Sequence, residues 1–547
     1  MFQDFPKNAE EAPEPAKAEV KGSIPGWLRG TLLRNGPGIF SVGTTSYNHW
    51  FDGLAIMHSF AFKDGEVTHR SRFLRSDTYN SNMSANSIVV SEMGTMAYPD
   101  PSKSLLTKAI TLFNHTVPDF TDNGASNFIK YGDDYFATSE TNYIRKIDPV
   151  TLETLDKVDY TKYLPVNLAT SHPHYDGEGN AYNMGTSIAE KGKTKYVLFK
   201  VPAASEEDRA KNAPALSRVE VLATVPCRTL LSPSYYHSFG MSDHYFVLVE
   251  QPFRLDILKM ATAYMRGVNW ASCLKFSPED NASVRYPRVR RSPLSAPPFE
   301  RSPLPQTVIH LIDRRTGKEV ETRYFAAPMV VYHHVNAFED AGHVVVDVVA
   351  YDDSRLFDMF YLKRSPEAGG AGAPVFSRPS YRRFALPVRP DKGAAAGGDL
   401  VGLTYTTARA VKQKEGRLLC RAEVLGEDFD MPRINPGFSG RRHRFVYGSC
   451  IEESSSAVKI GKLDTETKEL VYWYEDNCFP SEPVFIPRPN GESEDDGAVV
   501  SSVVTLSPDQ PGFILVLDGR TLKEVARAHV NAELHKDMHG FFIPQEC

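Results

Sequence analysis

The sequence predicts an all-β protein with a closed architecture, and two observations support this. Short runs rich in Val, Ile, Phe and Tyr, bounded by Gly, Asp, Asn or Pro, recur along the chain, which is typical of β-strands. Helical periodicity is rare, with 103–113 and 255–264 as the best candidates. A closed all-β domain can absorb 547 residues, so we expect one domain over 1–547. The clearest expected strands are 195–201, 244–253, 343–351, 497–506 and 513–518.

A short pattern, in which an apolar residue precedes Asp and Thr follows three positions later, occurs at Asp148, Asp313, Asp464 and Asp518. Asp and Thr side chains bond the nearby backbone, so the pattern indicates a tight turn between outer strands. The last two copies are separated by roughly one propeller blade of about 50 residues, whereas the other gaps are irregular. Two interpretations stay open: a repeat that marks blades, or a common hairpin turn.

The composition narrows the class of protein. The net charge of -6 is small for this length and argues against a nucleic-acid partner, which calls for a basic face. The six cysteines form no Cys-x-x-Cys pair and are few for a disulfide scaffold. No stretch reaches the about 18 apolar residues of a membrane span, and the acidic N-terminus has no apolar core. We expect a cytosolic protein, with residues 1–14 flexible.

Four of the sixteen histidines stand out by their surroundings. They are His172 in ATSHPHYD, His237 in PSYYHSFG, His333 in VVYHHVNAFED and His539 in DMHGFFIP. Aromatic, β-branched or small neighbours indicate burial, and a buried imidazole needs a hydrogen-bond partner or a metal. The long spacings suit ligands that converge from several blades on one axis. Ordinary core histidines are the alternative.

Several segments resemble the carotenoid cleavage oxygenases, a family that also includes the retinoid isomerase of the visual cycle. Beside the four histidine segments, they are LLRNGPG (32–38), YNHWFDG (47–53), SETNYIRKID (139–148) and PSEPVFIPRP (480–489). The resemblance runs from about Pro15 to the C-terminus. It implies a seven-bladed β-propeller, with a cap of helices and loops over an Fe(2+) site on the axis. Matched motif by motif, the implied iron ligands are His172, His237, His333 and His539.

The resemblance also implies three acids behind the ligands, because a metal-bound His usually donates its other N–H to a carboxylate. These are Glu140, Glu482 and Asp430. The family has Glu at the position of Asp430, which leaves open whether this shorter side chain reaches His333 directly or through a water. For each acid the alternative is a solvated surface charge.

Three aromatic residues match family positions along the substrate tunnel. Tyr235 and Tyr351 are expected in the wall, where aromatic faces stabilise the positive charge that develops on a polyene; ordinary core packing is the alternative. Phe479 stands where the more similar members carry Trp, so the tunnel shape is expected to differ there.

The segments 166–176 and 251–264 resemble the members that cut their substrate centrally. The implied reaction joins O2 to β-carotene at the 15,15′ double bond and gives two retinal. The alternatives are eccentric 9′,10′ cleavage, a retinoid isomerohydrolase, and a carotenoid-binding propeller without turnover.

Two segments differ from the family pattern. Residues 281–306 are rich in Pro, Arg and Ser and are expected to be a surface loop, either a true insertion or an error in the gene model. Ser102 replaces a Cys that carries a lipid in some members, which excludes acylation at this position. The run 104–113 is apolar at helix-like spacing and is expected either to make a peripheral membrane contact or to pack as a core helix.

Overall fold

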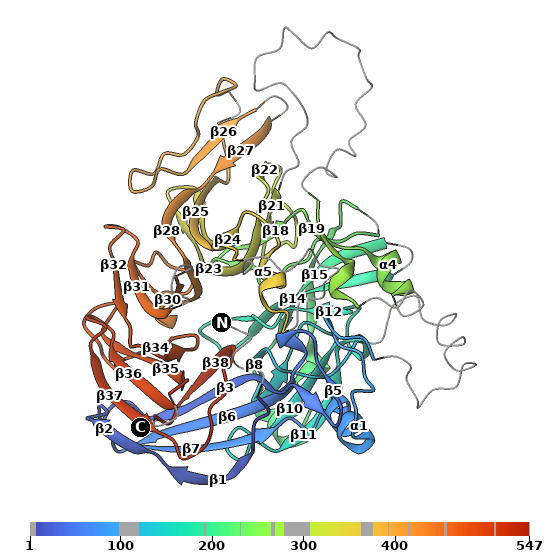
Figure 1. The fold of residues 1–547 in the computed structure, drawn as a ribbon. Helices are drawn as coiled ribbons and strands as arrows, with labels where there is room; N and C mark the ends of the chain where they lie inside the picture. Colours follow the sequence, from blue (N-terminus) through green and yellow to red (C-terminus); the bar gives the residue numbers. More distant parts are fainter. Residues whose placement is uncertain are drawn as a thin grey trace.

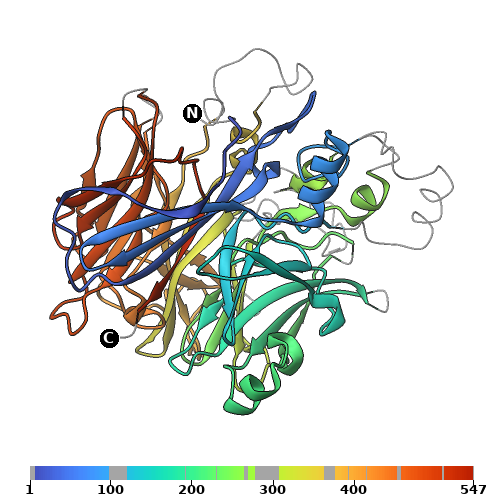
Figure 2. The same ribbon diagram turned by 90° about the horizontal axis from the view of Figure 1, so that it is seen from below.

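The chain forms a seven-bladed β-propeller in a computed structural model (Figures 1 and 2). The structure describes residues 7–545 except 98–119, 191–192, 230, 264–268, 278–306, 363–375, 392, 414–415, 453–456 and 508–509. Each blade is an antiparallel sheet apart from one parallel pair, β22 with β27. At several of the junctions between neighbouring blades, the innermost strands contact one another.

The blades, each from its innermost strand outward, are numbered here one to seven. Blade one is β38 (His539–Pro544), β3 (Gly30–Ile39), β6 (Leu54–Lys63), β7 (Glu66–Phe73) and β1 (Ala12–Lys17). Blade two is β8 (Asn127–Tyr131), β9 (Asp134–Thr138), β10 (Tyr143–Ile147) and β11 (Thr154–Asp159). Blade three is β12 (Leu168–Ala169) with β13 (His174–Tyr175), β14 (Ala181–Glu190), β15 (Lys193–Val201) and β16 (Glu220–Pro226). Blade four is β17 (Gly240–Met241), β18 (Tyr245–Glu250), β21 (Thr307–Asp313), β22 (Arg323–Ala326), β27 (Arg417–Arg421) and β26 (Arg409–Lys412).

The remaining three blades follow in the same way. Blade five is β23 (Val330–Asp340), β24 (His343–Tyr351), β25 (Ser380–Pro387) and β28 (Glu423–Glu427). Blade six is β29 (Phe429–Arg433), β30 (Phe445–Ile451), β31 (Val458–Asp464) and β32 (Leu470–Trp473). Blade seven is β33 (Cys478–Pro480) with β34 (Val484–Pro487), β35 (Gly497–Thr505), β36 (Phe513–Asp518), β37 (Glu524–His529) and β2 (Glu19–Gly22).

Strands from the two ends of the chain close the ring. The last strand, β38, pairs with β3 in blade one, and the early strand β2 pairs with β37 in blade seven. Residues 7–14, the described part of the segment expected to be flexible, make backbone contacts within blade one. Strand β1 begins at Ala12 and pairs with β7, and the buried Ala9 donates its N–H to the Gly38 carbonyl at 2.6 Å. The flexibility of 1–14 stays a prediction.

The Asp-Thr pattern marks the same place in four blades. In each copy the Asp carboxylate accepts the backbone N–H of the Thr, at 2.8 Å for Asp148, 2.7 Å for Asp313, 3.3 Å for Asp464 and 2.8 Å for Asp518. Each turn joins the third and fourth strands of its blade, namely blades two, four, six and seven. The pattern is therefore a structural repeat of the propeller as well as a hairpin turn.

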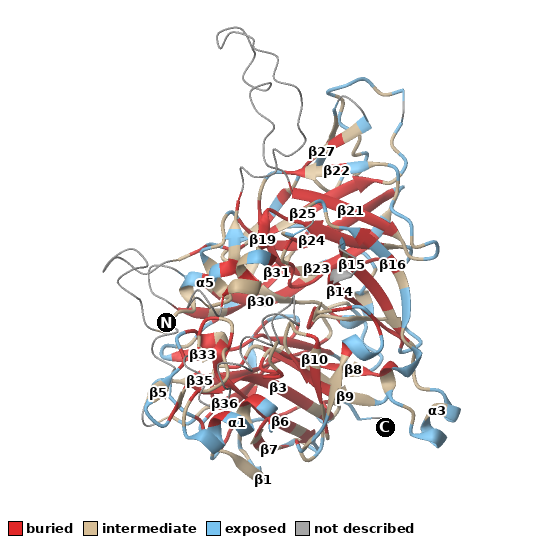
Figure 3. Cartoon of the chain, turned by 90° about the vertical axis from the view of Figure 1, so that its right-hand side faces the viewer, coloured by how far each residue is buried: buried red, intermediate tan, exposed pale blue. Residues whose placement is uncertain are grey.

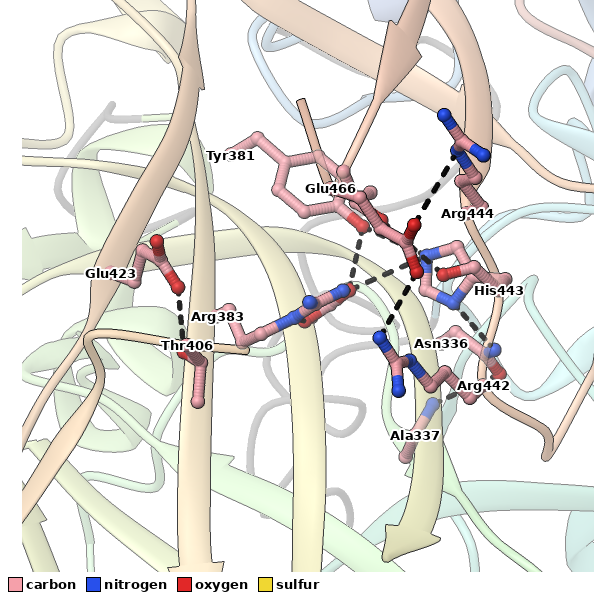
Figure 4. A network of polar contacts seen from close by, with 12 residues as sticks. Asn336, Ala337, Tyr381, Arg383, Thr406, Glu423, Arg442, His443, Arg444 and Glu466 are labelled. Carbon is pink, nitrogen blue, oxygen red and sulfur yellow. Dashed lines mark hydrogen bonds and ion pairs between the residues drawn. The ribbon is translucent and has the colours of Figure 1, made fainter. Parts of the chain in front are cut away.

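The apolar runs form buried strands, which Figure 3 shows in red. The five strands expected from the sequence correspond to β15, β18 with β19 (Phe253–Leu255), β24, β35 and β36. All nine residues of β24 are buried, including Asp347. Its carboxylate accepts bonds from Arg383 at 2.8 and 2.7 Å and from the Tyr381 hydroxyl at 2.8 Å. Tyr381 also bonds His443, which lies in the loop before β30, so this network ties blade five to blade six (Figure 4).

Short elements outside the blades complete the fold. They include α1 (Asp77–Ala85), α3 (Glu206–Lys211), α4 (Ile257–Thr262), α5 (Leu356–Met359), the 3-10 helices Trp50–Asp52 and Ala271–Cys273, and the small ribbons β4 (Ser41–Val42) with β5 (Thr45–Ser46) and β19 with β20 (Leu274–Phe276). Helix α4 lies inside the expected helix 255–264. The candidate helix 103–113, the apolar run 104–113 and the loop 281–306 lie outside the described residues. No described helix is long and apolar enough to cross a membrane.

Candidate metal centre

Four histidines from four blades meet at the propeller axis. His172 lies between β12 and β13 of blade three, and His237 shortly precedes β17 of blade four. His333 lies in β23 of blade five, and His539 is the first residue of β38 in blade one. One ring nitrogen from each falls within 4.8 Å of all the others. The four histidines singled out in the sequence are therefore brought together by the fold.

The geometry of this group fits a metal ion. In the described part of the chain, it is the one cluster of three or more His, Cys, Asp or Glu side chains spaced for metal binding. The Nε2 atoms of His172 and His237 lie 2.8 Å apart, and the Nε2 atoms of His333 and His539 are buried without a hydrogen-bond partner. Buried polar atoms without partners are costly. One ion between the rings would satisfy all four nitrogens.

Acids hold three of the four rings from behind. Glu140, from blade two, accepts a bond from Nδ1 of His237, and Asp430, on β29 of blade six, accepts from Nδ1 of His333 at 2.7 Å. Glu482, between β33 and β34 of blade seven, accepts from Nδ1 of His539 at 2.9 Å. Each bond fixes Nδ1 as the protonated nitrogen and leaves Nε2 free to bind a metal. The seven blades thus supply four histidines and three acids, one residue each.

Burial and charged neighbours shift the pKa values of two of these histidines and two of these acids. Burial lowers the pKa of His539 to about 4 and that of His172 well below its usual value, and the neutral imidazole is the form that binds a metal. Burial alone would raise the pKa of Glu482, but Arg433 at 2.8 Å and His539 hold it below its usual range. Burial likewise opposes the charge of Asp430, and the contacts with His333 and Tyr351 lower its pKa.

A mostly apolar cavity of about 310 Å³ opens onto the histidines. His237, His333 and His539 form part of its wall, together with Glu140, Asp430 and Glu482. Other wall residues come from the short helices outside the blades and from segments beside them, and they include Phe51, Phe120, Met260, Trp270, Leu356 and Phe357. The arrangement places a candidate metal centre in the wall of a mostly apolar chamber, which suits an apolar ligand.

The expected tunnel residues do not all lie in this wall. Tyr235 and Tyr351 do, and the Tyr351 hydroxyl donates to the second oxygen of Asp430. Phe479 is not among the described residues that line the cavity. Its side chain packs against the core cluster that includes Val484, Val504 and Ile514.

Tyr332 is a wall residue that the sequence reasoning missed. Its ring lies 5.9 Å from His237 and 5.6 Å from Tyr351, and its hydroxyl is buried without a partner. Regular alternation would place the neighbours Tyr332 and His333 on opposite faces of β23. The register of β23 shifts between Val331 and His333, and such a bulge re-aims side chains. Nothing in the sequence signals this shift, although Tyr332 adjoins a candidate ligand.

Known proteins match this chain over nearly its whole length. A family model described as "Retinal pigment epithelial membrane protein" matches residues 5–544. The chain is 53% identical over 541 residues to the β,β-carotene 15,15′-dioxygenase of Gallus gallus, which covers 99% of this chain and 98% of that protein. It is 37% identical over 548 residues to the mitochondrial carotenoid-cleaving dioxygenase of Homo sapiens, and the match covers 98% of this chain and 89% of that protein. The crystal structure of cobalt-substituted Synechocystis apocarotenoid oxygenase matches with a TM-score of 0.72 at 20% identity, and the match covers 100% of this chain and 98% of that chain.

Proposed function

The chain belongs to the retinal pigment epithelial membrane protein family, and on that premise we propose that it is an iron(II)-dependent dioxygenase that cleaves β-carotene at the central 15,15′ double bond into two retinal. The observation that carries the proposal is the full-length similarity to β,β-carotene 15,15′-dioxygenases, which exceeds that to the carotenoid-cleaving dioxygenases. The reaction partners are the carotenoid and O2.

In this proposal His172, His237, His333 and His539 hold the iron. Bound there, ferrous iron would supply the reaction with O2 that splits the polyene into two aldehydes. Glu140, Asp430 and Glu482 orient three of the rings through Nδ1. All four ligands are neutral, so the full charge of the ion stays at the site, unlike in a facial triad with its carboxylate.

The cavity wall serves the substrate. Its aromatic and aliphatic side chains exclude water and match the apolar surface of a carotenoid. Tyr332 lies beside His237 in this wall, and Tyr235 lies beside Tyr332. Their ring faces stabilise positive charge spread along the polyene without offering a strong nucleophile. Tyr351 holds Asp430 in place through its hydroxyl.

We further propose that residues 1–547 form one domain, that 281–306 is a surface insertion and that the protein is cytosolic. The five described cysteines form no disulfide with one another, as is usual in a reducing compartment. Collection of a lipid-borne substrate through a peripheral membrane contact of 104–113 completes the proposal.

Product analysis tests the function. The iron-loaded protein is incubated with β-carotene in air, and the carbonyl products are separated by chromatography. Retinal as the sole aldehyde supports central cleavage. Longer apocarotenals as the major products would indicate eccentric cleavage. Carotenoid that stays bound and uncleaved would indicate a carotenoid-binding protein without turnover. Conversion of all-trans retinyl ester to 11-cis-retinol would identify an isomerohydrolase.

A further inference from the structure

A lysine side chain lines the cavity that the proposed reaction would fill with aldehyde. Lys536 precedes β38, and Lys536, Asp537, Met538 and His539 are all wall residues. The Lys536 amine donates to the backbone carbonyl of Pro480 in β33. This bond links blades one and seven and fixes the direction of the Nζ atom. Among the described residues, Lys536 is the one lysine in the wall.

The surroundings of Lys536 make its neutral amine more accessible than that of an exposed lysine. The adjacent carboxylate of Asp537 is already engaged by the buried guanidinium of Arg34 and accepts a bond from Ser502. Burial, helped by Arg34 and opposed by Asp537, lowers the pKa of Lys536 from 10.5 to about 8. A neutral amine still donates one N–H to Pro480, and its lone pair becomes available as a nucleophile.

Lys462 shows what a structural buried lysine looks like in the same protein. It is 5% exposed and pairs with Asp495 at 2.6 Å, and it also donates to the Arg520 carbonyl at 2.7 Å. Lys462 lies outside the cavity wall. Lys462 therefore has an acidic partner and does not line the cavity, and Lys536 differs from it in both respects.

We propose that Lys536 is a covalent binding site for apolar polyene aldehydes, with which it condenses reversibly to a Schiff base inside the cavity. The inference rests on the proposed function, because cleavage is what supplies the aldehyde. The amine nitrogen adds to the carbonyl carbon, and loss of the carbonyl oxygen as water leaves a C=N bond. Both amine hydrogens depart in that water, no oxidant or reductant is needed, and hydrolysis returns the free aldehyde. A hydrocarbon or an alcohol of the same shape lacks the carbonyl and is not captured.

Reductive trapping tests this site without any turnover. All-trans-retinal is added directly to the purified full-length protein, cyanoborohydride reduces any imine to a stable amine, and peptide mass spectrometry locates the adduct. We expect an adduct at Lys536 approaching one per chain, with Lys462 unmodified. Retinol in place of retinal should give none. An unmodified Lys536 in the wild-type protein, or label spread evenly over exposed lysines, would overturn the inference.

Two variants separate reactivity from structure. Lys536→Arg keeps a donor for the Pro480 carbonyl but cannot form an imine, and Lys536→Met keeps the length of the side chain without the amine. Both should lose at least nine-tenths of the specific adduct, and persistence of that adduct in either would contradict the site. Wild-type peptide mapping decides the matter even if neither variant folds. Cleavage of β-carotene without the adduct would contradict this inference alone. The adduct without cleavage would contradict the proposed function alone.

Discussion

Asp430 shows how one residue adapts to a change within the centre. The family carries the longer Glu at this position, yet Asp430 reaches His333 directly at 2.7 Å. Strand β29 has an irregular register between Asp430 and Arg433, and Met431 adopts a left-handed φ of 51°. The Met431 N–H also donates to the Asp430 carboxylate at 2.7 Å. A bulge re-aims the side chain, so no bridging water is needed here.

The first prediction concerns this acid. Asp430→Asn should weaken metal binding about 10- to 100-fold, because a neutral amide no longer raises the basicity of His333. Tyr351→Phe is the matched control, since it removes a donor to Asp430 but leaves the carboxylate on His333. Tyr351→Phe should lower the metal affinity less than Asp430→Asn does. Anaerobic titration with Fe(2+) or Co(2+) measures both, and equal affinity of Asp430→Asn and wild type would show that this acid does not tune the ligand.

At the scale of single residues, the histidines and acids could be found from sequence motifs because chemistry limits which residue types serve as ligands. Tyr332 could not, since a register shift decides where its side chain points. The place of Phe479 could not either, because it depends on how blade seven packs against its neighbours.

At the scale of elements, the strands were predictable because each apolar run is bounded by turn residues. The Asp-Thr turns gave the repeat in four blades. In the other three no such turn marks the repeat. Blade four also takes its two outer strands, β27 and β26, from beyond β25 of blade five. Such an exchange follows from tertiary packing and leaves no local signal.

The buried Asp347 network gives the second prediction. Asp347→Ala leaves the Arg383 guanidinium, whose residue is 2% exposed, without its carboxylate partner. Removal of one partner of a buried ion pair lowers the free energy of unfolding by about 3–5 kcal/mol. The melting temperature should fall clearly. Asp133→Ala breaks the exposed pair with Arg209 and is the control, with little or no change expected. Equal melting temperatures for the two variants would mean that the network does not hold blades five and six together.

The third prediction concerns the segment between β20 and β21. Deletion of residues 282–305 should leave the melting temperature and the activity near those of the wild type. Its Pro, Arg and Ser content offers little to bury, and loop length has a small effect on stability. Differential scanning fluorimetry and product formation check this. A loss of solubility or a drop of the melting temperature would show that the segment packs on the propeller.

At the scale of the whole molecule, stability should depend on pH through a buried cluster in blade four. His310 bonds Glu250 at 3.0 Å and Glu319 at 2.7 Å. Burial alone would lower the pKa of His310, but these acids raise it from 6.5 to about 9. Its contribution, on the order of 3 kcal/mol, is full below pH 6.5 and lost as the pH rises through about 9. The pKa of Glu250 is lowered from 4.5 to about 2, against burial, by His310 and Arg228, so its contribution is lost on acidification below 4.5.

The fourth prediction follows from these signs. The melting temperature of the wild type should decline between pH 6.5 and 9, and His310→Gln should flatten that decline. His244→Gln removes an exposed His-Glu pair and serves as the control, with the wild-type slope retained. A slope that is the same in all three proteins would place the pH dependence elsewhere.

The propeller itself could be anticipated from strand runs, a turn repeat and family motifs. Closure of the ring could not, because it depends on β2 and β38 joining blades built from distant residues. This closure also completes the centre, since it brings His539 to the other three histidines.

The most direct test of the account compares iron content and retinal formation in the wild type, His237→Ala, His539→Ala and His334→Gln. His334 adjoins His333 but bonds Ser238 instead of facing the cluster, so it is the matched control. We predict one iron per chain and retinal formation in the wild type and the control, with both lost in the two alanine variants. Wild-type iron content and turnover in His237→Ala or His539→Ala would contradict the four-histidine centre and, with it, the proposed function.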